Sequence, residues 1–127
     1  MSNLFNNCPN YNQQVGDVFN FDDYKPTLIS DDFMYQTFLN CSSLTNVPVF
    51  NTSHWKITGG IAPNFMYWTF RNTPIVTPAI FDTSGWRPTT IGNSFMRGTW
   101  SNCMSMTTSV FPDVSNWNIT SIGEYFM

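Results

Sequence analysis

The stretch Phe33-Met34-Tyr35-Gln36-Thr37-Phe38-Leu39-Asn40-Cys41 recurs along the chain as residues 65–73 and 95–103, and residues 1–8 form a degenerate copy. The methionines of these copies stand at intervals of 33, 32, 30 and 31 residues, at Met1, Met34, Met66, Met96 and Met127. Intervals of this size are typical of repeat architectures. We therefore divide the single domain of 127 residues into four units, residues 1–33, 34–65, 66–95 and 96–127.

Other positions keep step with the methionines. An aromatic residue follows each of the first four of these methionines by four, and a tryptophan stands later in most units. One unit of this length cannot bury its rings alone, so we expect identical positions of successive units to pack in ladders. The expected ladders are Met34, Met66 and Met96; Phe38, Phe70 and Trp100; and Trp55, Trp86 and Trp117.

The pattern within each unit predicts a fold class. The segment around Leu44 and its counterparts is typical of a short strand, and the Met-x-x-Thr-Phe-x-Asn-Cys segment suits a helical turn. We therefore expect a β-rich, leucine-rich-repeat-like solenoid. Each coil of 30 to 33 residues would carry one short parallel strand and one short helical turn.

Two runs carry a resemblance to a known family. Residues Phe33-Met34 through Thr45, and Trp117-Asn118-Ile119-Thr120-Ser121-Ile122-Gly123, resemble the BspA-like leucine-rich-repeat surface proteins and the repeats of Mycoplasma-type surface lipoproteins. The resemblance covers all four units. It implies a right-handed leucine-rich-repeat-like solenoid on a cell surface or particle, used for adhesion or recognition and without a common catalytic site.

The composition disfavours several partners. Only 10% of the residues are charged, 42 of the 127 are Asn, Ser or Thr, and the net charge is −3. This surface lacks the basic footprint of a nucleic-acid-binding protein. No apolar run is long enough to cross a membrane, and the first residues do not have the pattern of a signal peptide. We expect no nucleic acid partner, no membrane insertion in this segment, and an extracellular, cell-surface or virion-surface location.

The residues that most often carry chemistry do not converge in the sequence. Cys8, Cys41 and Cys103 have neither disulfide-framework nor zinc spacing, and the single histidine, His54, has no second His or Cys nearby. The cysteines are better explained as small core residues. We expect no catalytic residue, no metal and no cofactor.

Two groups are candidate binding residues. A column of cations follows the Tyr/Trp position, and such a column is tolerated when acids such as Asp82 and Asp113, or an anionic ligand, lie beside it. Aromatic residues beside the methionines, together with Arg71 and Arg97, could form a patch for a sugar or a protein. The candidates are Lys25, Lys56 and Arg87 in the first group, and Tyr35, Tyr67 and Trp68 in the second.

The functional hypothesis is a non-enzymatic extracellular surface repeat protein acting in adhesion or in recognition of protein or glycan. The alternative is a structural subunit of a self-assembling filament, a surface layer, or a phage or virion appendage. Neither terminal unit carries an obvious polar cap. The expected partners are therefore other copies bound end to end, or flanking repeats of a longer chain, besides a glycan or protein ligand.

Overall fold

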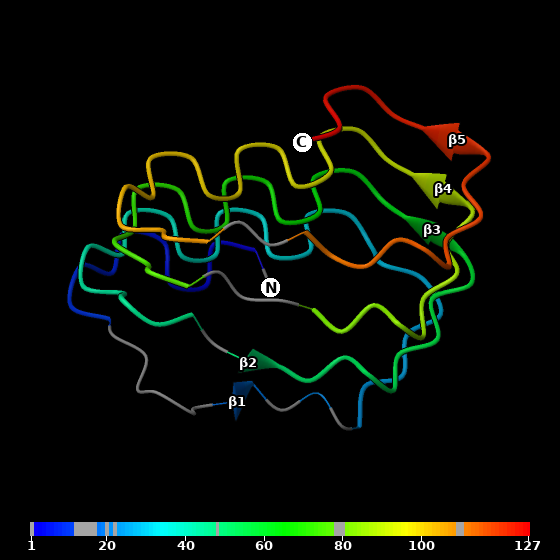
Figure 1. Ribbon diagram of the computed structural model, residues 1–127, viewed down its shortest axis with the longest axis horizontal. Helices are drawn as coiled ribbons and strands as arrows, with labels where there is room; N and C mark the ends of the chain where they lie inside the picture. Colours follow the sequence, from blue (N-terminus) through cyan, green and yellow to red (C-terminus); the bar gives the residue numbers. More distant parts are fainter. Residues whose placement is uncertain are drawn as a thin grey trace.

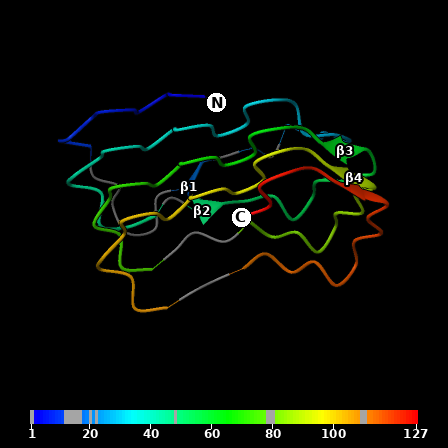
Figure 2. The ribbon, with the colours of Figure 1, turned by 90° about the horizontal axis from the view of Figure 1, so that it is seen from above.

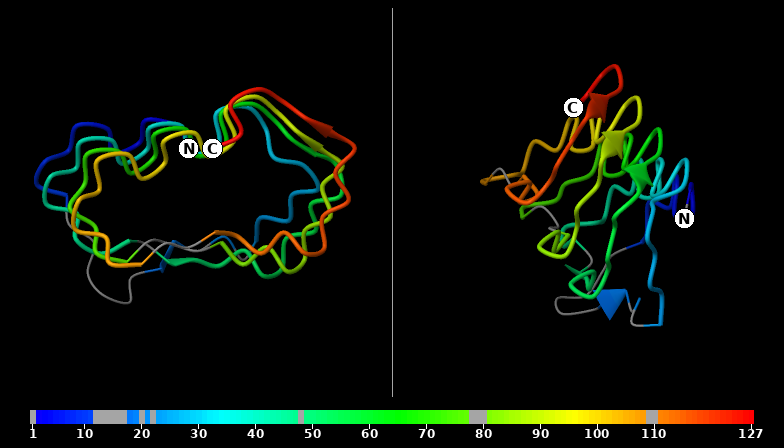
Figure 3. Two further views of the ribbon diagram at one scale, coloured as in Figure 1. Left: turned by 45° about the horizontal axis from the view of Figure 1, so that its top comes forward. Right: turned by 90° about the vertical axis from the view of Figure 1, so that its right-hand side faces the viewer.

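Corresponding segments of successive units lie side by side (Figures 1 and 3). The computed structural model describes residues 2–11, 18–19, 21, 23–47, 49–77, 81–108 and 111–127, with only the backbone described at Val18, Phe19 and Val49. Met1 lies outside the described residues. Seen from above, the units follow one another in sequence order from the N-terminal to the C-terminal side (Figure 2). The molecule is thus a stack of units, with unit 1 at one end and unit 4 at the other.

Among the described residues, regular secondary structure is limited to five strands of two residues each. Strands β1 (Val18–Phe19) and β2 (Val49–Phe50) form one parallel pair. Strands β3 (Gly60–Ile61), β4 (Thr90–Ile91) and β5 (Ser121–Ile122) form a separate parallel sheet in that order. Ile29 extends this second sheet through a single parallel bridge to Ile61.

The prediction of a leucine-rich-repeat-like solenoid with a strand and a helical turn in each coil is wrong. The described part of the chain contains no helix, and its two small sheets are separate rather than one continuous or closed sheet. Residues 41–47, around Leu44, form no strand, and Asn46 and Thr77 form an isolated parallel bridge. Strands β3, β4 and β5 lie instead where Ile61, Ile91 and Ile122 recur, because these β-branched residues favour extended backbone, and β1 and β2 lie at the Val-Phe pairs.

The expected helical turn is replaced by a run of four-residue turns, here called the turn segment, at residues 2–8, 34–41, 66–73 and 96–103 (top of Figure 1). In the second unit, the amides of Tyr35, Thr37 and Leu39 each donate to the carbonyl three residues earlier. Residues with φ near +60° recur in this run and in the following units, at Asp32, Met34, Gln36 and Asn40 and at their counterparts. Backbone of this kind cannot continue as a right-handed helix.

Intervening amides join each turn segment to the next unit. Gln36, Phe38 and Asn40 donate to the carbonyls of Tyr67, Thr69 and Arg71 at 2.9, 2.8 and 3.0 Å. The pattern recurs between the other neighbouring units. The threonine hydroxyls add bonds in the opposite direction, since Thr69 Oγ1 donates to the carbonyl of Met34 at 2.6 Å. Neighbouring units are therefore held together by main-chain bonds without long strands.

Burial in the turn segment explains why it resembles a helix in sequence. Residues 33–34, 37–38 and 41 are buried, whereas residues 35–36 and 39–40 are partly exposed. Pairs of inward residues thus recur every four positions. An amphipathic helix places apolar residues at nearly the same interval. The sequence pattern therefore fits both structures, and the left-handed residues decide between them.

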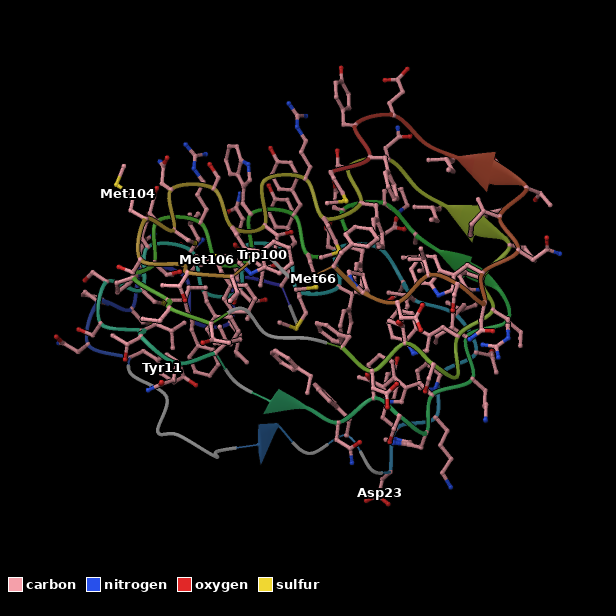
Figure 4. The ribbon with its side chains drawn as sticks, viewed as in Figure 1. Tyr11, Asp23, Met66, Trp100, Met104 and Met106 are labelled. Atoms are coloured by element: carbon pink, nitrogen blue, oxygen red, sulfur yellow. The ribbon has the colours of Figure 1, made fainter. Side chains whose placement is uncertain are left out.

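Ring ladders fill the interior between the turn segments and the opposite side of each unit. Phe38 and Phe70 stack with ring centroids 5.2 Å apart and an interplanar angle of 4°. Trp86 stacks between Trp55 and Trp117 at 5.9 and 6.2 Å. In Figure 4, Met66 and Trp100 lie inside the molecule, whereas Met104 and Asp23 point outward at its edges. The rings that repeat in the sequence thus form a shared core.

A second ladder runs along the outside. Asn40 Nδ2 donates to Asn7 Oδ1 at 2.7 Å, Asn72 Nδ2 to Asn40 Oδ1 at 2.7 Å, and Asn102 Nδ2 to Asn72 Oδ1 at 2.9 Å. All four residues have φ of 56 to 60°. Asparagine tolerates this region better than most residues with a side chain. The Asn column therefore supports both the turn and the contact between units.

We expect Trp86→Ala to lower the free energy of unfolding by about 3 to 5 kcal/mol, because it removes a fully buried ring from the middle of a ladder. Urea titration followed by tryptophan fluorescence and circular dichroism measures the change. Met104→Ala is the control, since the Met104 side chain is 94% exposed. An unchanged urea midpoint for Trp86→Ala would contradict the position of this ring.

We expect Asn72→Ala to destabilise the protein more than Asn72→Gly. Both variants lose the two ladder bonds of Asn72. The left-handed conformation of this residue, with φ of 59°, is unfavourable for alanine by about 1 kcal/mol but not for glycine. Thermal melts of the two variants give the comparison. Equal melting temperatures would show that the left-handed conformation contributes nothing to the difference.

Candidate functional site

The outward residues of the turn segments include a continuous group of rings and guanidinium groups. We call this group the aromatic-arginine ridge; it comprises Tyr35, Tyr67, Trp68, Arg71 and Arg97 of the turn segments, together with Tyr125, which follows β5. All six side chains are partly or fully exposed. The backbone bonds between turn segments fix their positions, because they hold the units that carry them in register.

The rings of the ridge stack on one another. Tyr35 and Tyr67 occupy the same position in adjacent units, and their centroids are 5.3 Å apart with an interplanar angle of 7°. Trp68 stacks beside Tyr67 at 4.7 Å. Several ring faces are therefore covered by neighbouring rings.

Gly98 makes room for Trp68. Its φ is +58°, and a Cβ atom built there would lie 2.8 Å from Trp68 Cδ1. Such a contact is closer than ordinary packing permits, and the left-handed backbone also favours glycine. The glycine therefore lets the indole lie against the neighbouring turn segment.

Both arginines of the ridge lie over aromatic rings. The guanidinium carbon of Arg71 is 4.1 Å from the Trp68 ring centroid, and that of Arg97 is 4.3 Å from Tyr125. Arg71 Nε is buried and has no hydrogen-bond partner. No ion pair involves either arginine within the described ranges. The ridge thus offers two guanidinium groups, stacked on rings, that have no acceptor among the residues the structure describes.

The other predicted binding group, the cation column of Lys25, Lys56 and Arg87, is not in contact with the ridge. Lys25, Lys56 and Arg87 are exposed in successive units, and Arg87 Nη1 bonds the carbonyls of Ser84 and Trp86 at 2.8 and 2.6 Å. Asp23, two residues before Lys25, lies at the edge away from the turn segments (Figure 4). The predicted binding residues therefore belong to two separate surfaces.

The acids expected beside this cation column form hydrogen bonds within their own loops. Asp82 Oδ1 accepts the amide of Ser84 at 3.0 Å, and Asp113 Oδ1 accepts that of Ser115 at 2.9 Å. Hydrogen bonds from the side chain and the amide of Ser84 lower the pKa of Asp82, and those from the amide and the side chain of Ser115 lower the pKa of Asp113. Pairing of Asp82 and Asp113 with the cation column is therefore not observed.

The single histidine and the cysteines are engaged with backbone. His54 Nε2 lies 2.9 and 3.1 Å from the carbonyl oxygens of Phe21 and Tyr24. Cys41 Sγ donates to the carbonyl of Phe5, and burial raises the pKa of the Cys41 thiol. Among the described residues, no group of His, Cys, Asp or Glu could hold a metal ion.

Two further findings concern membranes and relatives. The described residues include no helix capable of spanning a membrane. Comparisons with family models, with curated proteins and with solved structures found no match. The resemblance to BspA-like and Mycoplasma-type repeats therefore stays a prediction.

Tyr125 is the ridge residue that the sequence did not indicate. It lies two positions before Met127, where the other units have Asp32, Asn64 and Ser94, so no aromatic column points to it. Its side chain is 60% exposed, and its ring completes the contact with Arg97.

We expect Cys8 to react with a thiol reagent faster than Cys41 and Cys103. Cys8 is only partly buried, whereas the other two are buried and the pKa of Cys41 is raised. A raised pKa leaves less reactive thiolate at neutral pH. Labelling dilute native protein with a chromogenic disulfide reagent, followed by peptide mass spectrometry, measures the order. Equal rates at the three thiols would contradict this packing.

Proposed function

We propose that this chain is a non-enzymatic recognition protein whose aromatic-arginine ridge binds an acidic polysaccharide. The observation that carries the proposal is the state of Arg71. Its guanidinium group is stacked on Trp68, and in the described part of the chain its buried Nε has no hydrogen-bond acceptor. A ligand cannot reach the buried Nε, but the Nη groups of this partly exposed side chain have no acceptor among the described residues and can donate to an anionic ligand.

The chemistry of the ridge favours sulfate or carboxylate groups. An arginine fixed on a ring keeps the edge of its guanidinium group available for a two-point contact with such an anion. Arg97 provides a second cation, between Tyr67 and Tyr125. Phenol hydroxyls and the polar Asn and Thr side chains of the same surface suit sugar hydroxyls. An acidic polysaccharide combines both kinds of group.

The location at a cell or virion surface is part of this proposal. An acidic polysaccharide would be met there, and the low charge of the chain limits non-specific attraction to other anions. Because the ring faces are largely covered by one another, we expect the arginines to contribute more to binding than the rings.

We expect the protein to bind heparin, a sulfated polysaccharide, and not dextran, an uncharged one. Arg71→Gln and Arg97→Gln should each weaken heparin binding about tenfold, as expected for the loss of a charged hydrogen bond. Isothermal titration calorimetry at several salt concentrations measures the affinity. Affinity should fall as salt rises.

Arg87→Gln is the matched control, because it removes the same charge from an exposed arginine outside the ridge. Circular dichroism establishes that each variant is folded. Equal heparin affinity of the wild type and both ridge variants would overturn the proposal. If the wild type binds an acidic protein but not heparin, and both ridge variants lose that binding, the partner of the ridge is a protein rather than a polysaccharide.

A further inference from the structure

The C-terminal end of the stack carries a row of unpaired amide donors. In unit 3, the amides of Trp68, Phe70 and Asn72 donate to carbonyls of unit 4 at 3.1, 2.9 and 3.0 Å. The corresponding amides of unit 4 have no hydrogen-bond partner in the described part of the chain; they belong to Gly98, Trp100 and Asn102. This end therefore lacks the acceptors that every other turn segment has.

The N-terminal end carries the matching acceptors. The carbonyls that accept bonds in unit 2 belong to Tyr35, Thr37 and Leu39, and their counterparts in unit 1 belong to Ser2, Leu4 and Asn6. Within the described ranges, the carbonyls of Ser2 and Leu4 accept no hydrogen bond, and that of Asn6 has only a 3.8 Å contact with Cys8 Sγ. The two ends are thus complementary in both hydrogen-bond direction and spacing.

The Asn ladder is complementary in the same register. Each Asn in the interior donates Nδ2 to the Oδ1 of the preceding unit. Among the described residues, Asn7 Nδ2 and Asn102 Oδ1 are left without such a partner. A unit 1 placed after unit 4 would bring this donor to this acceptor.

Phe126 and Met127 lie in the layer that follows the turn segment of unit 4. The amide of Met127 donates to the carbonyl of Phe95 at 2.9 Å, and Phe126 stacks on Phe95 at 5.2 Å. Met127 therefore fills the methionine column, and the positions that follow it in the frame are those of Ser2 to Asn7. These are the residues that carry the unused acceptors.

Apolar surface is also exposed at both ends. Ile122, in the outer strand β5, is 56% exposed, and Phe126 is 38% exposed. Leu4 at the other end is 55% exposed, although its counterparts Thr37, Thr69 and Thr99 are almost fully buried between units. Covering these groups would add an apolar contribution to the unpaired main-chain groups.

We propose that the C-terminal end of one copy of this chain binds the N-terminal end of a second copy, so that Gly98, Trp100 and Asn102 donate to the carbonyls of Ser2, Leu4 and Asn6. Such a head-to-tail contact leaves one free end of each kind, so copies add without closure into a filament. This inference is independent of the aromatic-arginine ridge and of any polysaccharide. In a longer chain a further unit would fill the same place, and the 127-residue chain tests whether a second copy does.

Oxidative cross-linking tests the register. In the interior, Thr73 Oγ1 and Cys103 Sγ of adjacent units approach to 3.4 Å, and the proposed contact places Cys8 of the second copy next in this column. Cys41→Ser protein oxidised with copper phenanthroline should therefore form disulfide-linked dimers and higher species. Peptide mass spectrometry should identify the link as Cys8 to Cys103, and Cys8→Ser should remove it.

Sedimentation velocity tests the association itself. The wild type should sediment as a series of oligomers that grows with protein concentration. Leu4→Asp should weaken association at least about tenfold, because it buries an unpaired charge between the ends. Thr58→Asp is the charge-matched control, on an exposed position of an interior unit. If Leu4→Asp fails to fold by circular dichroism, Asn7→Asp replaces it, because it removes the free Nδ2 donor but keeps an acceptor for Asn40.

Monomeric wild type at every concentration, with a native circular dichroism spectrum, would overturn the proposal. Oligomers that lack the link between Cys8 and Cys103, or that persist unchanged in Leu4→Asp, would also overturn it, because they would use another surface. Heparin binding by the non-associating variant would show that the ridge acts without the filament.

Discussion

The hydrogen bonds between turn segments are the constraint on which the rest of the structure depends. Amides such as Gln36, Phe38 and Asn40 leave their own unit and reach carbonyls of the next. This direction requires a backbone in which left-handed residues recur, including buried methionines such as Met34 and Met66. Such residues are strained, at a cost of order 1 to 3 kcal/mol each, and the surrounding contacts must offset it. A unit without neighbours would keep the strain and lose the bonds.

Contacts between equivalent residues of neighbouring units are easier to predict from this sequence than the backbone conformation. Positions that share a column in the sequence do lie together, as the stacked pair Phe38 and Phe70 shows. The conformation was missed because apolar pairs every four residues fit a helix as well as linked turns. The Asn column and Gly98 were the signal that could have decided, since these residues accept positive φ and are poor helix formers. The recurring Ile positions likewise indicate strands β3, β4 and β5 better than the Leu44 column does.

The candidate site was predictable only in part. Tyr35, Tyr67 and Trp68 stand beside the methionines in the sequence, and their exposure follows from that position. The contact of Arg71 with Trp68 depends on the side-chain packing that Gly98 permits, and no sequence period shows this. The cation column of Lys25, Lys56 and Arg87 was equally regular in sequence. These cations nevertheless lie apart from the rings of the ridge, because each follows the Tyr/Trp position of its unit and lies outside the turn segments.

The equivalence of bonds from one unit to the next has an evolutionary consequence. Every bond of the Asn ladder joins the same position in two neighbours. Gain or loss of a whole unit by recombination would therefore preserve every column and change only the length of the molecule. Insertion of a single residue within a turn segment would instead turn buried rings outward and exchange left-handed for right-handed positions. Variation in this protein should therefore accumulate as unit number and as changes in the loops, where spacing between units already differs.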